Sequence, residues 1–153
     1  MIDYVKGDAT APPGEGNRII AHVCNDIGGW GRGFVVALSR RWPEPEQRYR
    51  EWHRDGAGFE LGAVQLVQVE PAIWVANMVA QRGLKATADG PPIRYAAVER
   101  CMSGVAEHAR QRSASVHMPR IGCGLAGGRW EEIEPILQRT LVAAGIHVTV
   151  HDL

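Results

Sequence analysis

The 153-residue chain carries 17 basic and 17 acidic residues, so its formal net charge is zero. General nucleic-acid-binding proteins usually carry a basic surplus, and we expect no such activity here. The three cysteines, Cys24, Cys101 and Cys123, show neither a disulfide framework nor zinc-ligand spacing, and we expect no metal. No apolar run approaches the roughly 20 residues of a membrane span, and the N-terminus does not resemble a signal peptide. We therefore expect a soluble, cytoplasmic protein without a membrane partner.

Strand-like and helix-like patterns interleave along the chain. Residues 18–24, RIIAHVC, form a nearly continuous apolar run that is typical of a strand covered on both faces. Residues 93–112 place Val98, Met102, Val105 and Ala109 on one helical face. In chain order, we predict strands at 2–5 and 18–24, helices at 34–41 and 43–54, strands at 62–69 and 73–79, a mobile loop at 84–92, a helix at 93–112, a strand at 115–118, a helix at 131–144 and a strand at 147–150. This alternation predicts one α/β domain over residues 1–153, with a mixed sheet between helical layers.

Two glycine-rich loops each follow a predicted buried strand. The first is NDIGGWGRG at 25–33, and the second holds Gly122, Gly124, Gly127 and Gly128 before a helix that opens near Trp130. Glycine allows backbone N–H groups to turn toward an anion, and a helix N-terminus adds partial positive charge. The second loop matches neither the dinucleotide nor the Walker fingerprint, and a plain tight connection is the alternative. Loops at the carboxyl ends of neighbouring strands would form one cleft for a phosphate- and sugar-containing ligand.

These motifs give the chain an end-to-end resemblance to a macrodomain. The resemblance is carried by YVKGD at 4–8, NDIGGWGRGF at 25–34, MPRIGCGL at 118–125 and VTV at 148–150. Within the superfamily the chain is most similar to the terminal ADP-ribose protein glycohydrolase branch, for which MPRIGCGL is a specific signature. The GGWGRG segment is also similar to the ADP-ribose-1''-phosphate phosphatases. The resemblance implies a three-layer α/β/α domain with an ADP-ribose cleft and no cofactor.

The resemblance also implies roles for individual residues. Asp8 would accept a hydrogen bond from the adenine amine, since an ionised carboxylate only accepts, although it could instead cap a turn. Asn25 would contact the distal ribose, Trp30 would wall the site, and His22 would be either a ligand contact or a core histidine. Cys123 has no chemical role in this resemblance. The expected ligand-binding residues are Asp8, Ala9, His22, Asn25, Trp30, Gly31, Gly33, Phe34, Pro119, Gly122, Cys123, Gly124, Leu125 and Ala126.

The catalytic pair of the glycohydrolase branch is absent from this sequence. The lysine that attacks the anomeric carbon in that branch aligns with Gln81, and the assisting aspartate aligns with Ala126. Glutamine cannot form the covalent intermediate, and alanine has no proton to exchange. The polar side chains left as catalytic candidates are Asn25, Asp26 and Gln81, although Asp26 could be a solvated turn residue.

Three functions are compatible with this resemblance. The one we favour is an enzyme that hydrolyses ADP-ribosyl esters on acidic side chains, because positioning a labile ester and a water can be enough. A non-catalytic reader of ADP-ribose and an ADP-ribose-1''-phosphate phosphatase are the alternatives. The expected partners are ADP-ribose or an ADP-ribosylated protein, and we expect a monomer.

Overall fold

A six-stranded mixed sheet forms the centre of the structure, a computed structural model that describes residues 1–153. Its strand order is β1-β6-β5-β2-β4-β3, and every neighbouring pair is parallel except β3 and β4. The strands are β1 (Ile2–Lys6), β2 (Arg18–Asn25), β3 (Val64–Glu70), β4 (Ile73–Gln81), β5 (Ser115–Met118) and β6 (Val148–Asp152). The central strands are apolar on both sides because helices cover both faces of the sheet.

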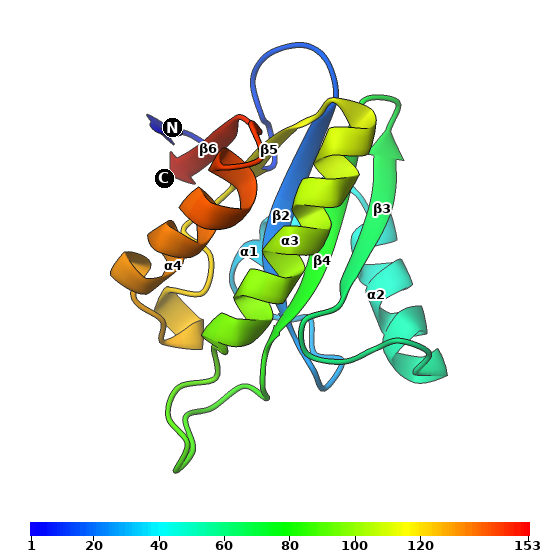
Figure 1. The fold of residues 1–153 in the computed structure, drawn as a ribbon. Helices are drawn as coiled ribbons and strands as arrows, with labels where there is room; N and C mark the ends of the chain where they lie inside the picture. The colour runs from blue at the N-terminus through cyan, green and yellow to red at the C-terminus, as the bar shows by residue number, and fades with distance from the viewer.

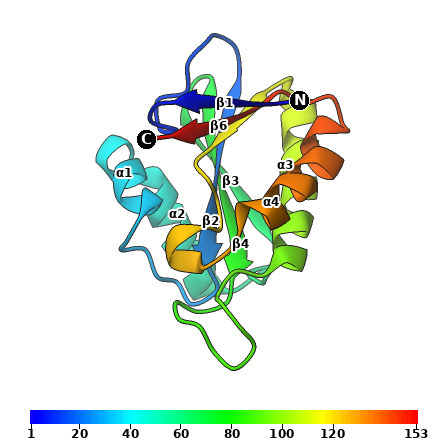
Figure 2. The ribbon, with the colours of Figure 1, turned by 90° about the vertical axis from the view of Figure 1, so that its left-hand side faces the viewer.

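Four α-helices cover the sheet, two on each face (Figures 1 and 2). One face carries α1 (Phe34–Arg41) and α2 (Glu44–Asp55), and the other carries α3 (Tyr95–Arg112) and α4 (Trp130–Leu137). The predicted three-layer α/β/α architecture with a mixed sheet is therefore confirmed. None of these helices is both long enough and apolar enough to cross a membrane.

Two apolar clusters fill the spaces between the sheet and the helical layers. The larger cluster contains side chains of α3 and α4, such as Val98 and Ile133, together with the inner residues of β2, β4, β5 and β6. The smaller cluster contains Leu38 of α1 and Tyr49 of α2, both fully buried. Burying both faces of the sheet leaves only the strand ends open, and the polar side chains of the predicted site lie there.

Local sequence signals explain how α2 begins and ends. Pro43 occupies the N-cap, where its missing N–H costs nothing. Gly56 ends the helix in the left-handed conformation at φ 81°, and its N–H donates to the carbonyl of Trp52 at 2.8 Å.

The structure corrects several predicted boundaries. The strand predicted at 73–79 continues to Gln81, because Gln81 pairs with Asn25 of β2 in the parallel ladder. The helix predicted at 131–144 is α4 followed by a π-helical segment, Gln138–Val142. The predicted loop at 84–92 contains a tight turn in which Thr87 and Gly90 exchange two backbone hydrogen bonds, at 2.8 and 2.9 Å.

Gly128 closes the second glycine loop through a contact that has no room for a side chain. Its N–H donates to the carbonyl of Gly122 at 2.7 Å, and a Cβ at residue 128 would lie 2.3 Å from that oxygen. We expect Gly128→Ala to lower the free energy of unfolding by about 2 kcal/mol, since backbone must move to admit the methyl group. Urea denaturation measures this loss. Gly31→Ala is the control, because a Cβ there meets nothing within 4 Å. Equal stability of the two variants would contradict the loop closure.

Candidate functional site

A cavity of about 520 Å³ opens at the carboxyl ends of β2 and β4. Its 13 lining residues are Val23, Cys24, Asn25, Gly29, Trp30, Gly31, Arg32, Val35, Arg50, Gln81, Leu84, Lys85 and Leu125. The first glycine loop supplies one wall, and Leu125 brings in the second loop. A Cβ at Gly33 would lie 3.6 Å from Cδ1 of Leu125, so the two loops meet beside the cavity. The predicted cleft between the two loops is therefore present.

The second loop presents a run of backbone donors. The N–H groups of four consecutive residues, Gly122 to Leu125, donate to no acceptor in the chain, and Ala126 completes the short 3-10 turn Gly124–Ala126. Gly122 and Gly124 have φ values of 73° and 63°, in the left-handed region where glycine is favoured. The next two N–H groups, of Gly127 and Gly128, close the loop by donating to Gly124 and Gly122. Successive free N–H groups of this kind form a concave anion site.

The first loop is organised by the side chain of Asn25. Its Oδ1 accepts hydrogen bonds from the N–H groups of Ile27 (3.0 Å) and Gly29 (2.9 Å), and its Nδ2 donates to the carbonyl of Gly29 at 2.9 Å. The buried hydroxyl of Tyr49 lies 2.9 Å from the same Oδ1 and 2.6 Å from the Asn25 carbonyl. These bonds limit what Asn25 can offer to the ribose or to catalysis, and its predicted role stays a prediction. Oδ1 is saturated by the loop, so only one N–H of Nδ2 is free for a ligand.

The other two catalytic candidates meet at one peptide group. Asp26 Oδ1 accepts the N–H of Gly83 at 2.8 Å, and Gln81 Nε2 donates to the Gly83 carbonyl at 2.9 Å. Asn25 and Gln81 face each other in the ladder, so the structure brings all three predicted catalytic residues together. Asp26 does not line the cavity, and its carboxylate ties the first loop to the turn after β4, which fits the turn-residue alternative. Gln81 does line the cavity, and its Oε1 accepts no hydrogen bond from the chain.

His22 lies beneath the cavity rather than in it. It is 1% exposed, and its Nε2 is 2.5 Å from Oδ1 of Asn77. The ring packs edge-to-face on Trp30, with 5.3 Å between centroids, and Phe34 lies at 6.0 Å. Burial lowers the pKa of His22 to about 4, so the ring is neutral. His22 is therefore a core histidine, although its partner is the side-chain amide of Asn77 and not a backbone group. Because the ring is buried, it cannot make the ligand contact that the resemblance implied.

Trp30 lines the cavity. Its side chain is 8% exposed, and its Nε1 donates to Oγ of Ser39 at 2.8 Å. This bond and the His22 ring fix the orientation of the indole. The wall is therefore a rigid surface against which a sugar or base could pack.

Asp8 caps a turn, which is the alternative that the sequence left open, and the adenine contact stays a prediction. Its Oδ1 accepts both the N–H and the hydroxyl of Thr10, each at 2.8 Å, and the backbone bond in particular lowers the pKa of the carboxyl. Oδ2 accepts nothing from the chain and is free to accept from an amine. Ala9 beside it is 3% exposed. Asp8 and Ala9 follow β1, while Pro119 follows β5 and is half-buried.

Several lining residues were not predicted from the sequence. Of the expected site residues, those in the cavity lining are Asn25, Trp30, Gly31, Gln81 and Leu125. The three charged lining residues, Arg32, Arg50 and Lys85, were missed because isolated cations in polar segments are usually solvated surface. Tyr49 and Asn77 were also missed as parts of the site. An asparagine inside the apolar run IWVANMV was the one available signal, because a buried amide needs partners.

Comparison with known proteins was made by sequence and by structure. No protein-family model matches the chain. The structure of a macrodomain protein from Streptomyces coelicolor is 55% identical in sequence and superposes with a TM-score of 0.90, over 100% of this chain and 99% of that one. The chain belongs to the macrodomain family.

Two curated relatives extend this comparison. This macrodomain is 35% identical over 159 residues to chromodomain-helicase-DNA-binding protein 1-like from Danio rerio, with 98% of the chain aligned, yet it spans only 15% of that protein's length. It is 27% identical over 152 residues to ADP-ribose 1''-phosphate phosphatase from Candida albicans, covering 90% of this chain and 92% of that protein.

The two positions that replace the glycohydrolase pair are neighbours in this macrodomain. Gln81 forms a β-bridge with Ile93, and the Ile93 N–H donates to the carbonyl of Ala126 at 3.2 Å. Ala126 is 5% exposed. Neither position carries an ionisable group, and no carboxylate lines the cavity. No three side chains of metal-ligating type converge elsewhere.

The buried His22 makes stability depend on pH. Its pKa is about 4 in the fold against about 6.5 in the unfolded chain, so the unfolded chain binds more protons between these values. The stabilisation is complete above pH 6.5 and is lost as pH falls toward 4, by about 2 kcal/mol between pH 8 and pH 5. We expect His22→Gln to lose less stability over that range than the wild type, in urea unfolding at both pH values. His117, with a pKa also near 4, is present in both proteins and cancels. Equal losses in the two proteins would show that His22 is not held neutral.

Proposed function

We propose that this macrodomain binds ADP-ribose across its two glycine loops and hydrolyses ADP-ribosyl esters on acidic side chains. The observation that carries the proposal is the run of N–H donors from Gly122 to Leu125 without acceptors in the chain. A diphosphate supplies acceptors of the required charge and spacing. The Candida relative, named for a phosphorylated ADP-ribose, supports the same ligand class.

The rest of the ligand follows from this placement. The free Oδ2 of Asp8 would accept from the adenine amine at the β1 end of the sheet edge. The distal ribose would enter the cavity beside Trp30 and Gly31. Its anomeric carbon would then lie near the carboxyl ends of β2 and β4, where Gln81 is exposed to the cavity.

The proposed chemistry uses neutral groups. Gln81 cannot act as a nucleophile, and the absence of a lining carboxylate leaves no side-chain base. An ester of glutamate or aspartate is labile, since the released carboxylate is a stable anion. Gln81 Oε1 can accept a hydrogen bond from a water, which would attack the ester linkage and release ADP-ribose and the free acidic side chain.

Two other functions have specific support. The missing lysine and aspartate favour a reader that binds without turnover. The GGWGRG segment and the Candida relative favour removal of the phosphate from ADP-ribose-1''-phosphate. We rank ester hydrolysis first, because no lining residue offers a base for phosphate transfer.

Release assays separate the three functions. We expect turnover of a glutamate-ADP-ribosylated peptide and none of ADP-ribose-1''-phosphate. Turnover of the second substrate alone indicates the phosphatase. A melting temperature raised by ADP-ribose without any turnover indicates the reader.

Gly124→Glu tests where the ligand binds. A carboxylate at this position would repel the diphosphate from the N–H groups, and we expect the change in melting temperature with ADP-ribose to disappear. Gly124→Ala is the matched control, since a Cβ there meets nothing within 4 Å and the strain from φ 63° is shared by both variants. ADP-ribose binding by a folded Gly124→Glu protein would show that the ligand lies elsewhere.

Gln81→Leu tests the water-positioning role. The substitution keeps the side-chain size and removes the amide, and we expect kcat to fall at least about tenfold while the Kd for ADP-ribose changes less than about twofold. Gln111→Leu, on the exposed surface of α3, is the control. A raised KM with unchanged kcat would mean that Gln81 only binds substrate.

A further inference from the structure

Positive charge without partners surrounds the mouth of the cavity. The only charged side chains in the lining are Arg32, Arg50 and Lys85. Arg50 is neutralised by Glu46 at 2.9 Å and also donates to the Gly28 carbonyl at 3.1 Å. Neither Arg32 nor Lys85 forms a salt bridge or a hydrogen bond through its side chain within the chain. Two cations are thus free to bind an external anion.

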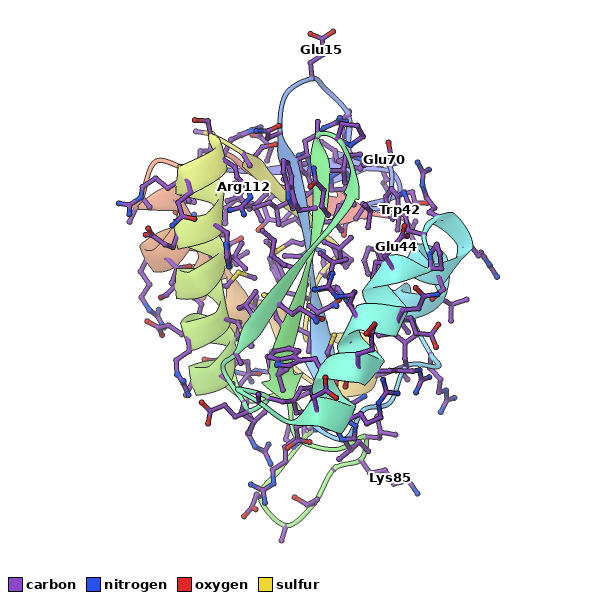
Figure 3. The ribbon with its side chains drawn as sticks, turned by 90° about the vertical axis from the view of Figure 1, so that its right-hand side faces the viewer. Glu15, Trp42, Glu44, Glu70, Lys85 and Arg112 are labelled. Atoms are coloured by element: carbon purple, nitrogen blue, oxygen red, sulfur yellow. The ribbon has the colours of Figure 1, made fainter.

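These two cations come from two different segments that line the cavity. Arg32 belongs to the first glycine loop, and Lys85 follows the turn after β4. Figure 3 shows Lys85 extending outward at the end of the molecule opposite Glu15. No carboxylate lines the cavity, and no salt bridge joins Arg32 or Lys85 to one. Asp26 and Asp89, the carboxylates of the same two segments, lie outside the lining.

Apolar side chains lie at the same mouth. Leu84 and Leu125 are 56% and 62% exposed, and both line the cavity. Two exposed leucines and two unpaired cations in one cavity lining match a polypeptide, which offers methylene groups as well as charges. The proposed diphosphate site uses backbone N–H groups and does not need these cations.

We infer that Arg32 and Lys85 bind carboxylates that flank the modified residue, so that the preferred substrate is an ADP-ribosyl ester within an acidic polypeptide segment. The inference rests on the proposed function, because that function places the ester, and hence the polypeptide, at the Gln81 end of the cavity. The chain as a whole has no net charge, so the attraction is local to the mouth. Exposed charges of this kind act mainly on encounter and are weakened by salt.

Two synthetic peptides test the inference. Each carries one ADP-ribosylated glutamate, flanked by glutamates in one and by glutamines in the other. We expect the wild type to prefer the acidic peptide by about fivefold in kcat/KM at low ionic strength, and to lose this preference near 1 M salt, where the Debye length is about 3 Å. Arg32→Gln/Lys85→Gln should bring the ratio close to one.

The matched control removes the same charge elsewhere. Arg48→Gln/Arg110→Gln changes two exposed arginines outside the cavity lining and should keep the preference. A wild-type ratio of one with both peptides cleaved overturns the inference and leaves the proposed function intact. If neither peptide is cleaved, the proposed function fails. The Kd values of the two peptides then test the inference: tighter binding of the acidic peptide supports it, and equal Kd values overturn it. The binding of an ADP-ribose oligomer is measured as well. If Arg32→Gln/Lys85→Gln weakens binding of the oligomer more than binding of the acidic peptide, the two cations serve the polymer and the inference is overturned.

Discussion

The parallel pairing of β2 with both β4 and β5 is the constraint on which the site depends. Parallel strands run toward the same edge of a sheet, so the segments that leave β2 and β4 start side by side, and the segment that leaves the shorter β5 heads toward the same edge. The interior of β2 is fully buried, with Ile19, Ile20 and Ala21 at 0% exposure, and this fixes its register against both neighbours. A β-bulge at the end of the β2–β4 ladder, between Cys24 and Asn25, shifts the pairing by one residue and places Gln81 opposite Asn25.

The two loops at this edge satisfy their backbone groups in different ways. The first loop is closed by the Asn25 amide and the Tyr49 hydroxyl, which occupy its donors and acceptors from within the protein. The second loop has no such side chain, and four of its N–H groups, from Gly122 to Leu125, have no acceptor in the chain. One loop is therefore a preformed wall, and the other keeps the backbone donors that the proposed anion would use. Preorganisation of the wall lowers the entropy cost of binding at the open loop.

The sequence predicted those features that depend on local pattern. Phe34–Arg41 and Ser115–Met118 were predicted to the residue, because helical spacing and a glycine-bounded apolar run are local signals. The π-helical segment after α4 was not, since a widened turn has no sequence period of its own. The roles of Tyr49 and Asn77 were missed because their partners lie 24 and 55 residues away. The unpaired state of Arg32 and Lys85 likewise depends on which carboxylates the fold brings near.

Gln81 and Ala126 are both uncharged, so neither position leaves an unpaired charge at the site. Both positions adjoin Ile93 through backbone contacts, and Ala126 is buried whereas Gln81 lines the cavity. An aspartate at the buried position 126 beside Gln81 would carry an unpaired charge with a high desolvation cost, and the paired lysine is what would offset it. Losing one partner alone would therefore destabilise the loop, whereas losing both leaves a site of neutral dipoles. Such a site can orient a water and a labile ester but cannot ionise a poor nucleophile, and this restricts its chemistry to bonds whose leaving group is already a stable anion.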